Sequence, residues 1–235
     1  MSLSRRTFVA SVAAAPLATG DGSLLASLRR FAPDPERLEP WIEVDPRALR
    51  ANAAVLSRLA RGRPLTAVIK NNGYGLGLVE VARVLDAAPE VSGFGVVKVQ
   101  EAVALRDAGI RKPVLLLALF TDAEGMELVR RDITLSLCVP DAAARVARAV
   151  FGANRSAKGQ YYIDTGMSRM GLPYHRAVPV LRELARLPRV EVVGTLTELA
   201  EERDFDSEQV RRCAPASRSS AAIPPTTAGK KASPR

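Results

Sequence analysis

The sequence predicts an α/β fold, namely an incomplete (β/α)8-type TIM barrel with about six βα units. Three observations support this prediction. Short apolar segments alternate with segments of helical apolar spacing from about residue 41 to residue 212. The 235 residues, 47% of them hydrophobic, suffice for one α/β core. The loops of most unusual composition follow apolar segments, and such barrels carry their functional groups at the strand ends.

The segments alternate between strand and helix. Asp45 can cap the first helix, and Pro46 suits its first turn. We expect strands at residues 41–44, 66–69, 94–97, 114–117, 133–138, 160–163 and 190–196, and helices at 46–59, 78–85, 100–107, 122–130, 141–150 and 175–187. Strands that are separated by helices of this length form right-handed βαβ units, in which the strands are parallel. We therefore expect a parallel sheet. Six strands from residue 66 onwards fall short of the eight in a closed barrel.

Residues 1–26 have the plan of a bacterial export signal. Arg5 and Arg6 precede a short apolar run and then small residues, which resembles a twin-arginine signal and is too short for a stable membrane span. We therefore expect export to the periplasm, with residues 27–40 as a linker. If the two arginines are coincidental, the start of the chain is disordered and the protein is cytoplasmic.

The composition changes after Arg212. Residues 213–235 are mainly Ala, Ser, Pro and Thr with four basic residues and no acidic one, which predicts a disordered basic tail. The barrel domain is therefore expected to cover residues 41–212. We also expect the polypeptide to be incomplete, through a frameshift near Arg212 or a natural truncation.

The charge and the cysteines exclude some functions. Part of the net charge of +9 lies in the tail, aromatic residues make up only 5%, and basic and aromatic residues do not interleave, so no nucleic acid is expected as a partner. Cys138 and Cys213 lie far apart without a metal-like spacing. We predict neither a disulfide framework nor a metal site.

The stretch from Ala67 to Gly77, A-V-I-K-N-N-G-Y-G-L-G, is a candidate binding site. Side chains alternate along a strand, so Lys70 shares the face of Thr66 and Val68 and lies at the strand's carboxyl end. A neutral lysine amine in such a place can form a Schiff base. The three glycines that follow allow backbone amides to approach an anion, and Tyr74 adds a hydroxyl group. An ordinary βα turn with an exposed lysine is the alternative.

A second candidate loop, D-T-G-M-S-R-M-G, spans Asp164 to Gly171 after the strand at 160–163. Its Arg169 suits a phenolate or a carboxylate through charge-assisted hydrogen bonds. The alternative is a surface arginine paired with Asp164. His175, the charged helix around Glu183, and the acidic residues 201, 202 and 204 are interpreted as surface features.

The two loops together resemble the alanine racemase family. The first stretch is similar to that family's pyridoxal-phosphate attachment motif, and Y-Y-I-D-T-G-M-S-R-M-G is similar to its second signature. The segments W-I-E-V-D-P-R-A-L-R-A-N and F-G-V-V-K-V-Q-E-A-V-A-L-R-D-A-G-I also match, so the resemblance covers about residues 41–212.

The resemblance implies an amino-acid racemase that depends on pyridoxal 5'-phosphate. Lys70 would be the catalytic residue and would attach the cofactor, Tyr74 would help to hold its phosphate, and Arg169 would bind its phenolic oxygen. Met167, with Arg169, would bind the carboxylate of a small amino-acid substrate such as alanine. The resemblance implies a homodimer whose second acid/base is a tyrosine on a C-terminal β domain. We expect no such domain within these 235 residues.

Three positions depart from the family pattern. Leu76 and Glu198 stand where the family has histidines, and Tyr162 replaces a lysine that is carbamylated in the family. Such changes hint at a divergent racemase. The alternatives are a single-domain protein that binds pyridoxal phosphate without catalysis, and an interaction protein whose basic tail binds polyanions.

Overall fold

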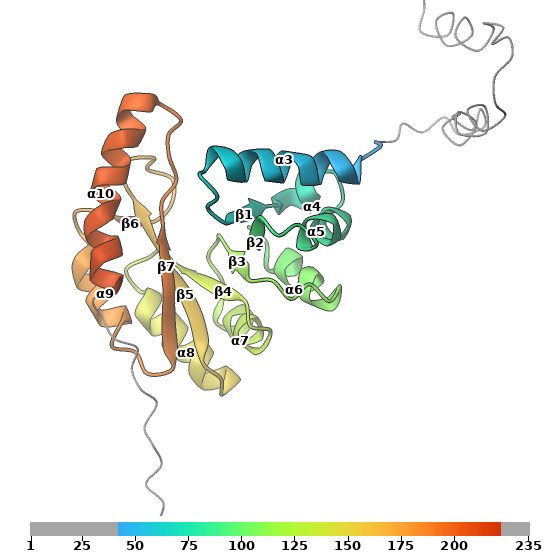
Figure 1. Cartoon of the computed structure of the whole chain (residues 1–235). Helices are drawn as coiled ribbons and strands as arrows, with labels where there is room; N and C mark the ends of the chain where they lie inside the picture. The colour runs from blue at the N-terminus through green and yellow to red at the C-terminus, as the bar shows by residue number, and fades with distance from the viewer. Residues whose placement is uncertain (1–41, 222–235) are drawn as a thin grey trace, which may run out of the picture. The chain divides into compact units, whose positions relative to one another are not determined.

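The computed structural model describes the backbone of residues 42–221 and the side chains of residues 42–214 (Figure 1). Residues 44–221 belong to one compact unit. The predicted export signal and linker lie outside the described residues, as do residues 222–235. No helix in the described part of the chain is long and apolar enough to cross a bilayer.

The strands form one parallel sheet. They are β1 (Leu65–Val68), β2 (Val91–Val96), β3 (Val114–Leu116), β4 (Thr134–Leu137), β5 (Ala157–Asp164), the two-residue β6 (Leu172–Pro173) and β7 (Val190–Leu196). The order is β1-β2-β3-β4-β5, and both β6 and β7 pair with β5. Without β6, the sheet has the six strands expected of an incomplete barrel, and β1 and β7 are its outer strands.

Helices connect the strands and pack beside one another along the sheet (Figure 1). They are α3 (Pro46–Leu59), the short α4 (Lys70–Tyr74), α5 (Leu78–Asp86), α6 (Val99–Asp107), α7 (Asp122–Arg130), α8 (Ala142–Ala153), α9 (Ala177–Leu184) and α10 (Arg203–Ala221). Asp45 caps α3 as expected, because its carboxylate accepts the Arg47 amide at 2.8 Å.

The sequence-based prediction fails at three places. Residues 42–44 form no strand, because no neighbouring strand pairs with them among the described residues. The segment after residue 69 is expected to be a loop, but Lys70–Tyr74 forms the tight turn α4. The change of composition at Cys213 does not end the ordered structure, since α10 continues to Ala221. In the first half of this helix, Gln209 bonds Thr165 and the Glu198 carbonyl, which follow β5 and β7.

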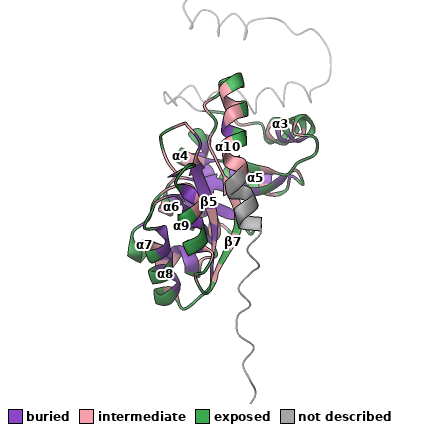
Figure 2. Ribbon diagram, turned by 90° about the vertical axis from the view of Figure 1, so that its left-hand side faces the viewer, coloured by how far each residue is buried: buried purple, intermediate pink, exposed green. Residues whose placement is uncertain are grey.

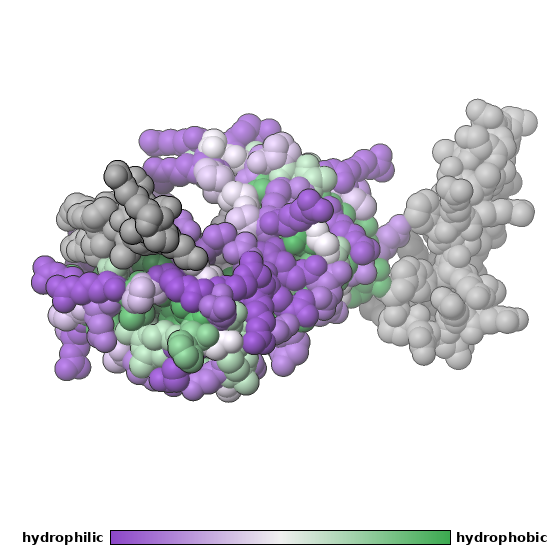
Figure 3. Space-filling view, turned by 90° about the horizontal axis from the view of Figure 1, so that it is seen from below, coloured by the Kyte–Doolittle hydropathy of each residue, from purple (hydrophilic) through white to green (hydrophobic). Residues whose placement is uncertain are grey.

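The central strands are buried on both faces, whereas the outer strands are not (Figure 2). In β1, Val68 is 42% exposed, and in β7, Val193 is 42% exposed. Their neighbours Ala67 and Val192 pack against the core instead. The exposed faces of the outer strands are what an unclosed barrel leaves uncovered. The face of the molecule seen from below is mostly hydrophilic, with hydrophobic areas between the hydrophilic residues (Figure 3).

Candidate active site at the carboxyl ends of the strands

Lys70 follows β1 directly and begins a turn of unusual handedness. Asn71, Asn72, Gly73 and Tyr74 all have positive φ angles, between 53° and 62°. A run of left-handed residues is costly for side chains other than glycine, and asparagine tolerates it best. The sequence N-N-G therefore suits the turn, which closes through a hydrogen bond of 3.0 Å from the Gly73 amide to the Ile69 carbonyl.

Two side chains hold this turn in place. The Asn72 side-chain oxygen accepts the Leu78 amide at 3.0 Å and so caps α5. The Asn72 amide donates to Glu101 Oε1 at 3.0 Å, and the other oxygen of Glu101 accepts the Lys98 amide at 3.2 Å. One buried carboxylate thus ties the loop after β1 to the loop after β2.

The remaining residues of the first motif lie close to Lys70. Its Nζ is 6.0 Å from the centre of the Tyr74 ring, at the limit of a cation–π contact. Tyr74 is 62% exposed, and its hydroxyl group has no hydrogen-bond partner among the described residues. Gly75 and Gly77 have φ angles of 89° and 93°. The turn therefore presents an amine and a hydroxyl group beside a backbone that only glycine adopts easily.

The second motif forms a compact loop after β5. Asp164 Oδ1 accepts the Gly166 amide at 2.9 Å and the Ser168 amide at 3.0 Å. The amide of Met167, between them, has no hydrogen-bond partner among the described residues. At Gly171 the chain returns so closely that a Cβ atom would lie 2.6 Å from the Asp164 nitrogen. A glycine is required there, both by this contact and by a φ angle of 113°.

Arg169 does not pair with Asp164, which was the alternative from the sequence. Its Nη2 donates to Glu198 Oε1, on the loop after β7, in an ion pair. Glu198 Oε2 accepts the Tyr162 hydroxyl group at 3.0 Å. Burial raises the pKa of Tyr162, and Arg169 lowers it by a smaller amount, so the phenol stays protonated and donates. Two of the three departures from the family pattern, Tyr162 and Glu198, thus contact one another.

Helix α10 joins the loops after β5 and β7. The fully buried Gln209 donates to Thr165 Oγ1 and to the Glu198 carbonyl, both at 3.0 Å, and accepts the Ala200 amide at 2.8 Å. Thr165 also bonds Thr197 at 2.7 Å. The two loops and the helix therefore share one buried polar network.

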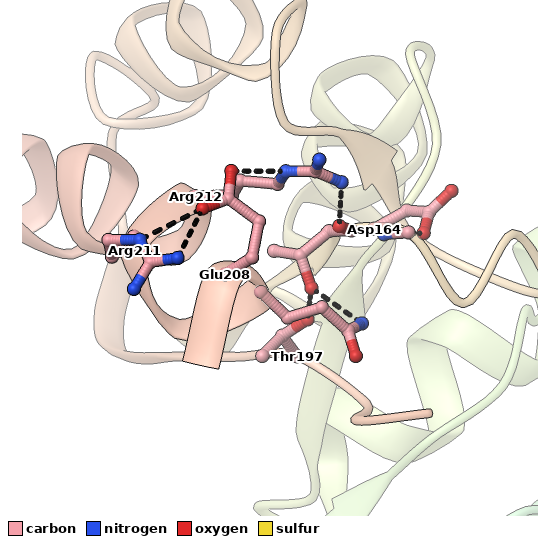
Figure 4. A network of polar contacts seen from close by, with 8 residues as sticks. Asp164, Thr197, Glu208, Arg211 and Arg212 are labelled. Atoms are coloured by element: carbon pink, nitrogen blue, oxygen red, sulfur yellow. Dashed lines mark hydrogen bonds and ion pairs between the residues drawn. The ribbon is translucent and has the colours of Figure 1, made fainter. Parts of the chain in front are cut away.

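Arg212 adds a second contact between α10 and the loop after β5, as Figure 4 shows. It donates to the Thr165 carbonyl and to Glu208 Oε1, both at 3.0 Å, and lies over the rings of Tyr174 and Phe205. Bonds from Arg211 and Arg212 lower the pKa of Glu208. The acidic partner thus stays ionised where α10 meets the loop.

Other candidate groups take no part in this arrangement. Cys138 is buried, which raises the pKa of its thiol. His175 packs edge-on against Tyr174, at 5.3 Å between ring centres. No group of three or more potential metal ligands occurs in the described part of the chain.

A family model described as "Alanine racemase, N-terminal domain" matches residues 44–231. The chain belongs to the alanine racemase family. The alanine racemase of Syntrophobacter fumaroxidans is 36% identical over 167 residues, which make up 71% of this chain and 44% of that protein. This chain therefore spans less than half of the length of that relative. Members of the alanine racemase family use pyridoxal phosphate as their cofactor.

Solved structures agree with the alanine racemase fold. A crystal structure of alanine racemase from Corynebacterium glutamicum has a TM-score of 0.69 and 28% identity, covering 78% of this chain and 53% of that one. A histidine racemase from Leuconostoc mesenteroides has a TM-score of 0.66 at 24% identity, covering 72% of this chain and 46% of that one. The latter similarity concerns the fold alone.

The structure places all four site residues of the sequence analysis at the carboxyl edge of the sheet. Lys70 and Tyr74 follow β1, whereas Met167 and Arg169 follow β5. Two residues that organise these loops, Glu101 and Gln209, were not predicted from the sequence. Glu101 lies within a quoted segment, but nothing in its sequence context shows that its carboxylate is buried.

Proposed function

We propose that this chain binds pyridoxal phosphate through Lys70, and that it is part of an amino-acid racemase acting on alanine or a related small amino acid. The supporting observation is that the Lys70 loop and the Arg169 loop follow β1 and β5, parallel strands of one sheet. Parallel strands place the loops at their carboxyl ends on the same edge, where α/β folds bind ligands.

The residues present suit the cofactor. The Lys70 amine can attach to the aldehyde group, with loss of water, while the Tyr74 hydroxyl group and the glycine-rich turn are available for the phosphate. Arg169 uses only Nη2 for Glu198, and its Nε and Nη1 have no hydrogen-bond partner among the described residues. These donors can bind the phenolic oxygen of the cofactor or a substrate carboxylate. The unpaired Met167 amide is a further donor for that carboxylate.

Bound pyridoxal phosphate withdraws electrons from the α-carbon of an amino acid and makes its proton acidic. Lys70 is the residue that takes and returns this proton on one face. Racemisation also needs an acid/base on the opposite face. We assign no described residue to that role, and a non-catalytic protein that holds pyridoxal phosphate is therefore the second candidate.

Cofactor uptake tests the proposal directly. The full-length chain is incubated with pyridoxal phosphate, and the absorption of the lysine-linked cofactor is recorded before and after borohydride reduction and peptide mapping. We expect the reduced cofactor to be found on Lys70 in the wild type. In Lys70→Ala, we expect neither the absorption band nor the labelled peptide. Lys98→Ala is a matched control, because Lys98 is an exposed lysine after the neighbouring strand β2. A wild-type chain without the band would refute cofactor binding, and a band unchanged by Lys70→Ala would refute attachment through Lys70.

Chiral analysis separates the two candidates. L-alanine is incubated with the cofactor-loaded protein, and the D-enantiomer is measured. Formation of D-alanine supports a racemase. Retention of the cofactor without any conversion, for alanine and for other small amino acids, supports the non-catalytic binding protein.

Two further parts of the proposal concern location and assembly. We propose that residues 1–26 direct export, which a reporter fusion with Arg5 and Arg6 replaced by lysine tests through loss of periplasmic activity. We also propose that a longer form is a homodimer, which sedimentation analysis tests. A reporter exported equally well by both fusions, or a monomeric longer form, contradicts the respective proposal.

A further inference from the structure

We infer that Glu198 is the positioning residue of Arg169: its carboxylate holds the guanidinium in place and offsets part of its charge, while Tyr162 and Gln209 hold Glu198. The inference rests on the proposed function, because Arg169 is there a cofactor and substrate ligand. It adds a residue from the loop after β7 to a site that the sequence assigned to the loops after β1 and β5.

The two carboxylate oxygens of Glu198 have different partners. Oε1 accepts Arg169 Nη2, and Oε2 accepts the Tyr162 hydroxyl group at 3.0 Å. Tyr162 is buried and lies within β5, so its position is fixed by the sheet. A carboxylate anchored at one oxygen to a rigid strand can orient a guanidinium at the other oxygen.

The backbone of Glu198 is also held by a hydrogen bond. Its carbonyl accepts Gln209 Nε2 at 3.0 Å, and the same side chain also bonds Thr165 and Ala200. Gln209 is fully buried, which makes its three hydrogen bonds expensive to break. The loop that carries Glu198 is therefore held from its backbone side as well as from its carboxylate.

Arg169 and Glu198 are both partly accessible to solvent. The Arg169 side chain is 53% exposed and that of Glu198 is 34% exposed, so the pair lies at the surface of the network rather than inside it. An exposed ion pair contributes little to folding stability. Its geometry instead leaves Arg169 Nε and Nη1 free among the described residues, with the guanidinium already oriented. This arrangement serves ligand binding more than stability.

The negative charge of Glu198 affects the pKa of the groups around it. Arg169 and Tyr162 are the charged and titratable groups bonded to Glu198, and Asp164 and Cys138 lie close enough to Tyr162 to influence its pKa. Removing a carboxylate lowers the pKa of neighbouring groups, because the protonated form loses a favourable charge. In Glu198→Gln, the lysine-linked cofactor should therefore lose its proton at a lower pH than in the wild type.

The experiment follows the absorption of the lysine-linked pyridoxal phosphate as a function of pH in four proteins. We expect the transition midpoint to fall by about half a pH unit in Glu198→Gln, and to stay near the wild-type value in Glu198→Asp, which keeps the charge. Glu202→Gln is the matched control, because it removes an exposed carboxylate from the same connection without a contact to Arg169. Equal shifts in the Glu198→Gln and Glu202→Gln proteins would overturn the positioning role.

A cofactor-free measurement accompanies it. The Arg169 Nη–H signals in NMR spectra should exchange with solvent several-fold faster in Glu198→Gln than in the wild type, because Nη2 loses its carboxylate acceptor, with an unchanged circular dichroism spectrum. If the wild type takes up no cofactor, the proposed function and this inference both fall. If the wild type binds the cofactor but Glu198→Gln changes neither its midpoint nor the Arg169 exchange, this inference alone falls.

Discussion

The amide of Asn72 donates to the carboxylate of Glu101 at 3.0 Å, although the two residues lie 29 positions apart. Glu101 is only 7% exposed, and it also accepts the amides of Val97 and Lys98. The left-handed turn that carries Lys70 is therefore held by an acidic side chain at the start of α6. This contact makes the conformation of the candidate site a property of two βα units rather than of one loop.

Replacing Glu101 by glutamine should destabilise the protein by about 1–3 kcal/mol. Both carboxylate oxygens of Glu101 accept backbone amides, but glutamine has only one side-chain oxygen. Its NH2 group would face backbone N–H donors in place of the other oxygen. Urea unfolding followed by circular dichroism measures the change. Glu183→Gln, on the exposed side of α9, is the control and should leave the midpoint within error; equal losses would contradict the role of Glu101.

Gly171→Ala should be strongly destabilising, by about 2–5 kcal/mol. The new Cβ atom would lie 2.6 Å from the Asp164 nitrogen, and the φ angle of 113° disfavours any side chain. Gly62→Ala separates the two effects, because Gly62 has a φ angle of 74° but no atom within 4 Å of a Cβ position. Thermal unfolding of both variants measures the difference, and a Gly62→Ala loss as large as that of Gly171→Ala would refute the steric argument.

Tyr161 should make stability depend on pH in the alkaline range. Burial raises its pKa from 10.0 to about 12, and its hydroxyl group donates to the Leu181 carbonyl at 3.0 Å. The folded protein thus keeps a proton that the unfolded chain loses above about pH 10, so this stabilisation is complete below pH 10 and is lost as the pH rises towards 12.

Urea titrations of wild type and Tyr161→Phe at pH 9 and pH 11 test this effect. Between these two values the stability advantage of the wild type should shrink by about 1.4 kcal/mol, because one pH unit above the unfolded pKa corresponds to that free energy. Other titrating groups are common to both proteins and cancel. An advantage that does not change with pH would show that Tyr161 has an ordinary pKa.

Cys138 should resist alkylation in the folded protein. It is 2% exposed, and burial raises the pKa of its thiol, so both access and thiolate formation are disfavoured. In Cys213→Ser, only Cys138 can react with iodoacetamide. This reaction should be more than about a hundredfold slower in the folded protein than in the protein unfolded by urea. Cys138→Ser reports on Cys213, which is partly exposed and should react faster. Rapid native labelling of Cys138 would contradict the buried position.

Local patterns predicted most of the fold. The helix over Asp122–Arg130 and the strand over Val190–Leu196 have the bounds expected from the sequence. The apolar spacing and the helix caps are properties of neighbouring residues, so they can be recognised without knowing the fold. The strand expected at 41–44 is the counterexample, because an isolated alternation makes a strand only where a partner pairs with it.

The two candidate loops were also visible in the sequence, since their residue types are unusual and each follows an apolar segment. Their internal conformation was only partly predictable. The run N-N-G permits a left-handed turn but does not require one. The alternative prediction, that Arg169 pairs with Asp164, is wrong. Asp164 is the nearest acid in the sequence, but in the structure it binds backbone amides.

The sequence by itself determined the alternation of strands and helices, and it placed Lys70 and Arg169 after two of the strands. Only the tertiary structure decided that Glu198 lies between Arg169 and Tyr162, that Gln209 joins two loops, and that α10 continues past Cys213. The physical reason is sequence distance. Periodicity and caps act within a few residues, whereas the Tyr162–Glu198 bond joins groups 36 residues apart that meet only when parallel strands align their ends.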